Sequence, residues 1–174
     1  MSFQTEFDKA YEAKRNEDTD LVLSFLSEWE EKADLEHIPY FMKLFENSPL
    51  DDQQNDAVMD LLDHIIEKKP EKTIEIIVQN ISILIKENAE FCIGDVVYML
   101  LSNHEDLAGF IAEAVLNADE EVKQILLNLI EKEKNDKYLS EAAEKVLSIY
   151  VDLEKKTRQE REHKKWFKNL VFGN

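Results

Sequence analysis

The chain has 174 residues and a formal net charge of −17, from 38 Asp and Glu residues against 21 Lys and Arg. Such a negative chain repels nucleic acid and anionic membranes, so direct nucleic-acid binding is not expected, and a basic protein partner is favoured. Apolar residues make up 44% of the chain, which is enough for a core. Only three Gly and three Pro are present, so the tight turns of a β-sheet are hard to supply.

Nothing in the sequence predicts a membrane span, a signal peptide or a disulfide. No apolar run approaches the roughly 20 residues that cross a bilayer. Residues 1–15 lack the basic region followed by an apolar stretch that a signal peptide requires. The one cysteine, Cys92, cannot form an internal disulfide. It lies in the apolar run 91–100, and we expect a small buried side chain in a cytoplasmic protein.

Apolar side chains recur at helical spacing along nearly the whole chain. Helices are predicted over 19–32, 35–48, 52–68, 71–88, 90–102, 103–117, 120–133, 137–156 and 160–172. Pro70 should stop one helix and begin the next, where its missing N–H is no loss. Helix caps are predicted at Asp51 or Asp52, at Asn103, at Asn117, and at Asn135 or Asp136. Gly94 and Gly109 fall inside helices and are interpreted as points of close packing.

The spacing of these helices predicts the fold class. Successive helix starts are about 14 to 19 residues apart, so a pair takes roughly 30 to 37 residues, near the period of helical-hairpin repeats. We therefore expect an all-α protein of about 8–10 helices, in antiparallel hairpins that form a short HEAT-like α-solenoid array. A closed helical bundle is the alternative. The expected division is a helical-repeat domain over 1–153 and a basic C-terminal tail or capping helix over 154–174.

The C-terminal segment differs from the rest of the chain in charge. Residues 155–174 hold seven Lys or Arg against two Glu, a net charge of +5, so the remaining chain carries −22. An apolar edge accompanies the lysines and consists of Trp166, Phe167, Leu170 and Val171. We expect this edge to cover the end of the array, as terminal repeats require. Contact with a partner, homo-oligomerisation through the tail, and binding to an anionic membrane surface are the alternatives.

The stretch 58–72 raises the question of a functional site. Asp60, Asp63, His64 and Glu67 lie opposite the apolar side of one predicted helix. A metal site needs ligands that converge from more than one element, which this spacing does not supply, so we expect no metal. No nucleophile motif or phosphate-binding glycine loop occurs, and neither a catalytic residue nor a cofactor is predicted. The prediction is a partner-binding face of Asp60, Asp63, His64, Glu67, Glu75 and Gln79.

Residues 56–117 carry a family resemblance in three motifs. These are "VMDLLDHIIE" at 58–67, "PEKTIEII" at 70–77 and "AEF" at 89–91. The segment resembles an α-helical, HEAT-like family of bacterial immunity proteins, which protect cells from polymorphic toxins. The family tends to carry Trp where this chain has Phe91, and an Arg later in the same helix, where this chain has "YMLL".

The resemblance implies a non-enzymatic, cytosolic protein that occludes a toxin domain, without a cofactor. Many such toxins are basic nucleases, so the −22 body would steer the capture of a basic toxin domain. Two other functions remain open at this point. One is a general helical-repeat scaffold or adaptor that docks another cellular protein, and the other is an enzyme with a cryptic site.

Overall fold

A computed structural model describes residues 2–46, 52–102 and 105–172. In these ranges all regular structure is helical, and no strand occurs. The α-helices are α1 (Phe3–Arg15), α2 (Thr19–Trp29), α3 (Ile38–Phe41), α4 (Asp52–Lys68), α5 (Pro70–Gln79), α6 (Ile81–Lys86), α7 (Cys92–Ser102), α8 (Ala108–Asn117), α9 (Glu120–Glu133) and α10 (Ser140–Phe172). Short 3₁₀ helices are η1 (Leu35–His37), η2 (Met42–Leu44) and η3 (Glu105–Leu107). The prediction of an all-α protein is confirmed.

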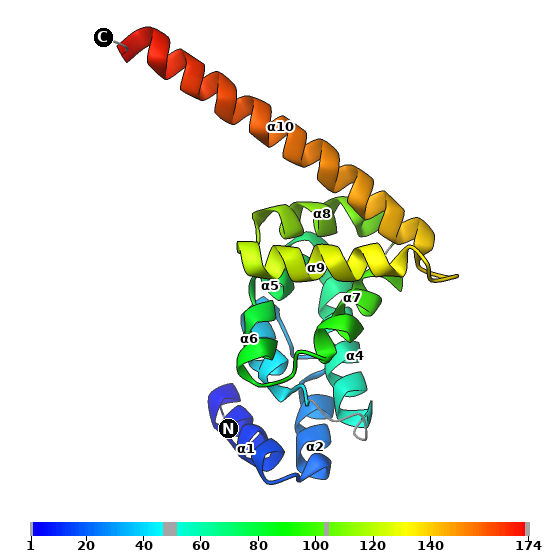
Figure 1. Ribbon diagram of the computed structural model, residues 1–174. Helices are drawn as coiled ribbons and strands as arrows, with labels where there is room; N and C mark the ends of the chain where they lie inside the picture. Colours follow the sequence, from blue (N-terminus) through cyan, green and yellow to red (C-terminus); the bar gives the residue numbers. More distant parts are fainter. Residues whose placement is uncertain (1, 47–51, 103–104, 173–174) are drawn as a thin grey trace.

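The helices follow one another from one end of the molecule to the other (Figure 1). The α1–α2 hairpin forms the N-terminal end, and α2 packs on α4. Helix α4 contacts α5 and α7, and α5 in turn contacts α8. At the opposite end α8 and α9 pack against the first part of α10, which then runs away from the rest of the molecule.

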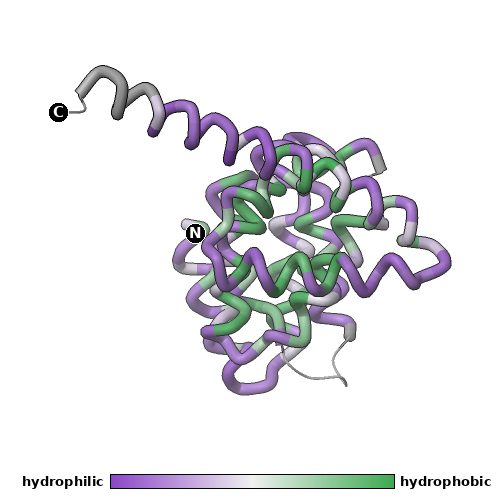
Figure 2. Tube along the Cα trace, turned by 45° about the horizontal axis from the view of Figure 1, so that its top comes forward, coloured by the Kyte–Doolittle hydropathy of each residue, from purple (hydrophilic) through white to green (hydrophobic). Residues whose placement is uncertain are grey.

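One continuous apolar core extends through these helices, from Phe7 in α1 to Tyr150 in α10. Figure 2 shows apolar positions turned inward along the helices of the body and polar positions outside. At the N-terminal end the core is aromatic. The Phe3 ring lies 4.7 Å from Trp29 and 4.2 Å from the His37 imidazole, between centroids. His37 Nδ1 also accepts the backbone N–H of Asp34, so its role there is structural.

Several helix ends follow the local sequence signals. Helix α4 ends at Lys68 and α5 begins at Pro70, which confirms the prediction for that proline. Asp136 accepts the backbone N–H groups of Tyr138 and Leu139 just before α10, as a capping residue should. The prediction for Asn117 is wrong, because it is the last residue of α8 and Asp119 precedes α9. Asp51, Asn103 and His104 lie outside the described residues.

Other elements differ from the prediction. Helix α1 was not predicted, and it begins where Ser2 Oγ accepts the N–H of Thr5. The helix predicted over 71–88 is divided between α5 and α6 at Asn80. The Asn80 side chain donates to the carbonyl of Ile76 at 2.8 Å, a local bond that competes with the helical ladder. The segment 35–48 forms η1, α3 and η2 in succession over its described part.

The two helical glycines have a different role from the one predicted. A Cβ built on Gly94 or on Gly109 would meet no atom within 4 Å. Neither glycine has a positive φ. The interpretation of both as close-packing points is therefore wrong, since the space beside each is open.

Helix α10 is continuous across the predicted boundary between residues 153 and 154. Its 33 residues span about 50 Å at 1.5 Å per residue. From Glu154 to Trp166 every side chain is exposed except that of Thr157, which is half-buried. The basic segment thus extends α10 into solvent, and its described part does not cover the array. In residues 2–46, 52–102 and 105–172, no helix has both the length and the apolar character needed to cross a membrane.

Candidate functional site

The predicted acidic face on α4 is present as a stripe along one side of that helix. Asp60 and Glu67 are exposed, whereas Asp63 and His64 are half-buried. His64 Nδ1 lies 3.9 Å from Glu67 Oε2, a distance at which the two attract when the imidazole is protonated. The stripe therefore presents negative charge to solvent next to one imidazole.

Glu75 and Gln79 on α5 form a separate group. Lys72 Nζ donates to Glu75 Oε2 at 2.7 Å, and Gln79 Nε2 donates to Glu75 Oε1 at 3.3 Å. The hydrogen bond from Lys72 holds the pKa of the Glu75 carboxyl below its usual value. Glu75 thus already has two partners on its own helix, and a ligand would have to compete with them.

Two of the six predicted residues line grooves, and the two grooves are different. Asp60 lines a groove of about 260 Å³ between α2 and α4. Glu75 lines another groove, of about 150 Å³, between α5 and α8, together with Glu71, Glu113 and Phe110. Asp60 and Glu75 thus line different grooves, and the six predicted residues do not converge on either of the two.

The α2–α4 groove has the chemistry to receive a basic side chain. Leu26 and Leu61 line it and are buried, whereas Glu30 and Asp60 are exposed carboxylates beside them. A lysine or arginine side chain combines an aliphatic stem with a charged head. Such a side chain could lay its stem on the leucines and place its charge between the two carboxylates.

An exposed aromatic pair on and beside α7 was not predicted from the sequence. Phe91, one residue before α7, is 70% exposed, and Tyr98 is 53% exposed. The two are seven residues apart, which places them on one side of the helix about two turns apart. Gly94 and Asp95 lie between them on that side, and the open space at Gly94 leaves the helix backbone accessible. The i, i+7 spacing of two aromatics was the available signal in the sequence.

A charged cluster lies at the junction of α1 and the end of α6. The Tyr11 hydroxyl donates to both oxygens of the Glu87 carboxylate, at 2.9 and 2.8 Å, and Lys14 Nζ lies 3.7 Å from Glu87 Oε2. Lys14 also donates to the carbonyl of Lys43 at 2.6 Å. Burial raises the pKa of Tyr11 and lowers the pKa of Lys14. Tyr11, Lys14 and Glu87 thus have one another as polar partners, and their contacts hold α1 against the end of α6.

Cys92 does not have the surroundings of a reactive thiol. It is fully buried, as predicted, and its Sγ donates to the carbonyl of Glu46 at 3.1 Å. Burial raises the pKa of the thiol to about 11, so the thiolate is scarce at neutral pH. Among the described side chains, no three His, Cys, Asp or Glu residues lie together in a way that could hold a metal ion.

The chain was also compared with known proteins in three ways. A scan against protein-family models, a search of the curated proteins and a search of the solved structures each found no match to this chain.

Proposed function

We propose that this chain is a non-enzymatic immunity protein, which binds a basic bacterial toxin domain in the cytoplasm and occludes its active or binding surface. The observation that carries the proposal is the exposed pair of Phe91 and Tyr98 on α7 of a strongly acidic protein. Large exposed aromatics are the residues that most often anchor protein interfaces. The resemblance of residues 56–117 to immunity proteins supplies the class of partner.

The proposed mechanism combines steering with anchoring. The acidic surface accelerates the encounter with a positively charged toxin, because charge complementarity acts mainly on the association rate. The Asp60 groove then receives a lysine or arginine side chain of the toxin. Phe91 and Tyr98 bury their rings against the toxin and slow its dissociation, since well-packed aromatic anchors act mainly on the off-rate. The helical hairpins form a HEAT-like array that holds these surfaces in place.

Co-expression with the toxin tests the proposal. The candidate toxin is the product of a gene adjacent to the one for this protein, and it is expressed with and without this chain in a sensitive host. Restored growth, together with a purified complex of the two proteins, supports immunity. Continued killing by the toxin, or restored growth without a complex, contradicts the proposal. If the toxin still kills the host and this chain instead binds other cellular proteins, the chain would be a scaffold.

The aromatic pair provides a variant for the same assay. A chain carrying both Phe91→Ala and Tyr98→Ala should rescue growth less well than the unaltered chain, because its complex dissociates faster. Tyr138→Ala is the matched control, because Tyr138 is an aromatic residue that is 79% exposed but lies outside α7, in the turn before α10. Equal rescue by all three chains would exclude the α7 surface.

A further inference from the structure

The projecting half of α10 has no partner within the described chain. Val151 is 42% exposed and Trp166 is 59% exposed, although both are large apolar side chains. Between them only Leu153 and Thr157 are half-buried. Most helical stability in proteins comes from packing of one face, and from Glu154 to Trp166 the side chains other than that of Thr157 are exposed. A second surface that packs against one face of this segment would stabilise it.

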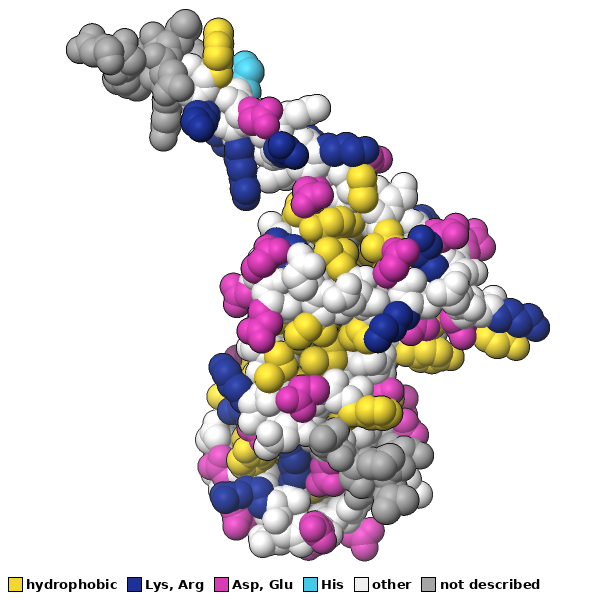
Figure 3. Space-filling view, in the orientation of Figure 1, with side chains coloured by type: hydrophobic (Ala, Val, Ile, Leu, Met, Phe, Trp, Pro, Cys, Tyr) yellow, Lys and Arg dark blue, Asp and Glu magenta, His cyan; other side chains and the backbone are white. Residues whose placement is uncertain are grey.

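A groove at the base of α10 offers such a surface. It has a volume of about 400 Å³ and is lined by α9 and α10. Leu147 and Val151 supply its apolar lining, Glu131, Glu144 and Asp152 supply carboxylates, and Lys134 and Lys155 supply ammonium groups. Lys134 Nζ lies 2.8 Å from Glu131 Oε1. Figure 3 shows apolar side chains gathered beneath the base of α10, with basic side chains along the projecting part. The groove thus offers an apolar floor to a large side chain, with charges of both signs around it.

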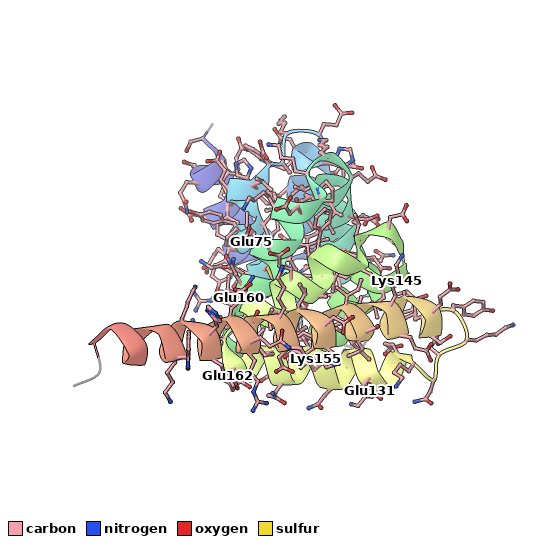
Figure 4. The ribbon with its side chains drawn as sticks, turned by 90° about the horizontal axis from the view of Figure 1, so that it is seen from above. Glu75, Glu131, Lys145, Lys155, Glu160 and Glu162 are labelled. Atoms are coloured by element: carbon pink, nitrogen blue, oxygen red, sulfur yellow. The ribbon has the colours of Figure 1, made fainter. Side chains whose placement is uncertain are left out.

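The groove-facing side of α10 continues into the projecting segment. At about 100° per residue, positions 151, 155, 162 and 166 lie within about 60° of one another around the helix. Figure 4 shows Glu160 and Glu162 on opposite sides of α10, with Glu162 on the side of α9 and Glu131. Between positions 151 and 166, the residues nearest the middle of this side are Val151, Lys155, Glu162 and Trp166, with Arg158 and Gln159 at its two edges.

The spacing of these four residues is the same in both directions along the chain. The steps are four, seven and four residues, so the spacing is symmetric about a point between Arg158 and Gln159, and the two charged residues at mirrored positions have opposite signs. A symmetric dimer places residue i of one copy on residue j of the other and the reverse. An antiparallel pair of α10 helices with its two-fold axis at this point brings every one of the four residues to a complementary partner.

We propose that α10 pairs antiparallel with α10 of a second copy of this chain. Trp166 of each copy lies on Val151 of the other and enters the groove between α9 and α10. Lys155 of each copy forms an ion pair with Glu162 of the other. This pairing does not depend on the toxin partner proposed above.

The present contacts of these charged groups do not oppose the pairing. Lys155 Nζ lies 3.8 Å from Asp152 Oδ1, and Arg158 Nε lies 3.4 Å from Glu162 Oε1. All four side chains are more than two-thirds exposed, at 69 to 82%. Ion pairs this exposed contribute little, so their exchange for contacts across a dimer costs little.

Charge exchange between Lys155 and Glu162 tests the proposed register on the full chain. Sedimentation equilibrium at tens of micromolar protein should show a dimer. Lys155→Glu alone or Glu162→Lys alone should raise the dissociation constant roughly tenfold or more, because each change places two like-charge pairs in one interface. The double variant restores both pairs with reversed polarity and should dimerise as the unaltered chain does.

The matched control for these variants is Lys137→Glu, an exposed lysine in the turn before α10. It changes the net charge as Lys155→Glu does and should leave dimerisation unchanged. A chain that stays monomeric overturns the proposal, including one that binds vesicles of anionic lipid through α10. A dimer in which the double variant is as weak as the single variants also overturns it.

Disulfide trapping gives a second, independent test. Gln159 lies beside the proposed axis, so Gln159→Cys in two copies should form a disulfide dimer on mild oxidation. Gln124→Cys, at an exposed position on α9, should not. Cys92 does not interfere, because its thiol is buried. Trapping at 159 without trapping at 124 supports the antiparallel pair, and equal trapping at both positions, or none at 159, contradicts it.

Discussion

The phenol of Tyr11 donates to both oxygens of the Glu87 carboxylate, which joins the N-terminal helix to a residue 76 positions later. We expect Tyr11→Phe to destabilise the chain by about 1 to 2 kcal/mol, because the half-buried carboxylate loses its donor and keeps only Lys14 at 3.7 Å. Urea unfolding measures the change. Tyr98→Phe is the control, since the exposed Tyr98 should show no change. Equal midpoints for both variants would contradict a structural role for the Tyr11 hydroxyl.

The buried thiol of Cys92 should make stability fall at alkaline pH. Its pKa is raised from about 9 to about 11, so between these values the folded state keeps a proton that the unfolded chain releases. The stabilisation is complete below pH 9 and is lost as pH rises toward 11, by about 3 kcal/mol in total. Unfolding at pH 8, 9 and 10 should show this slope, and Cys92→Ala should reduce it. An unchanged slope in the variant would show that other groups cause it.

Alanine at either helical glycine should stabilise the protein. The Cβ of Gly94→Ala or Gly109→Ala enters open space, and neither position has a positive φ. Each change restricts the unfolded chain, and because both positions lie in the first turn of a helix we expect a gain of about 0.5 kcal/mol. The urea midpoint should rise at a constant m-value. A lower midpoint would mean that the glycines are packed against neighbours.

Reversing the charge of the α4 stripe should slow capture of a basic partner. The triple variant Asp60→Lys, Asp63→Lys and Glu67→Lys should lower the association rate constant and its dependence on ionic strength, because steering acts before contact. Stopped-flow or surface-based kinetics with the toxin domain measures both quantities. Unaltered kinetics would exclude this face as the docking side.

A control for net charge accompanies this triple variant. It carries the same number of reversals at exposed acids of the N-terminal hairpin: Asp8→Lys, Glu12→Lys and Asp20→Lys. If steering is local to the α4 stripe, this control should slow association less. Equal slowing by the two variants would show that only the total charge matters.

The aromatic pair on α7 should act on dissociation. Phe91→Ala and Tyr98→Ala should each raise the off-rate of the same complex, roughly tenfold or more if each ring is an anchor worth about 1.4 kcal/mol or more. Tyr138→Ala should leave it unchanged. A change confined to the association rate would assign the two rings to steering and remove them as anchors.

Helical periodicity predicted most elements, because core packing in a helical protein repeats at the helical period. The break at Asn80 escaped prediction, since apolar residues continue on both sides of it and the local signal is one asparagine, whose side chain donates to the carbonyl of Ile76. The sequence also left α1 unassigned, although Phe7, Ala10 and Ala13 follow helical spacing. The joint between Tyr11 and Glu87 depends on tertiary contact, which no local pattern encodes.

The site was predicted only in part, for a related reason. The acidic stripe could be predicted because the apolar and polar residues of α4 fall on opposite sides of the helix. Helix α7 is apolar nearly all round, with buried side chains on most of its surface, so the pattern does not reveal which aromatic residues face solvent. The exposure of Phe91 and Tyr98 depends on where α4 and α9 pack against α7. That placement comes from the fold as a whole.

The two tryptophans lie in contrasting surroundings. Trp29 packs edge-on against Phe3 within the N-terminal aromatic cluster, and its indole N–H donates to Glu6 at 2.8 Å. Trp166 stands in solvent on the projecting part of α10. The emission maxima of the two tryptophans should therefore differ. In the variant Trp166→Phe, Trp29 is the tryptophan that remains, and its emission follows unfolding of the α1–α2 hairpin. In the unaltered chain, a blue shift in the emission of Trp166 alone would show that α10 has gained a contact. The emission of Trp29 would stay the same.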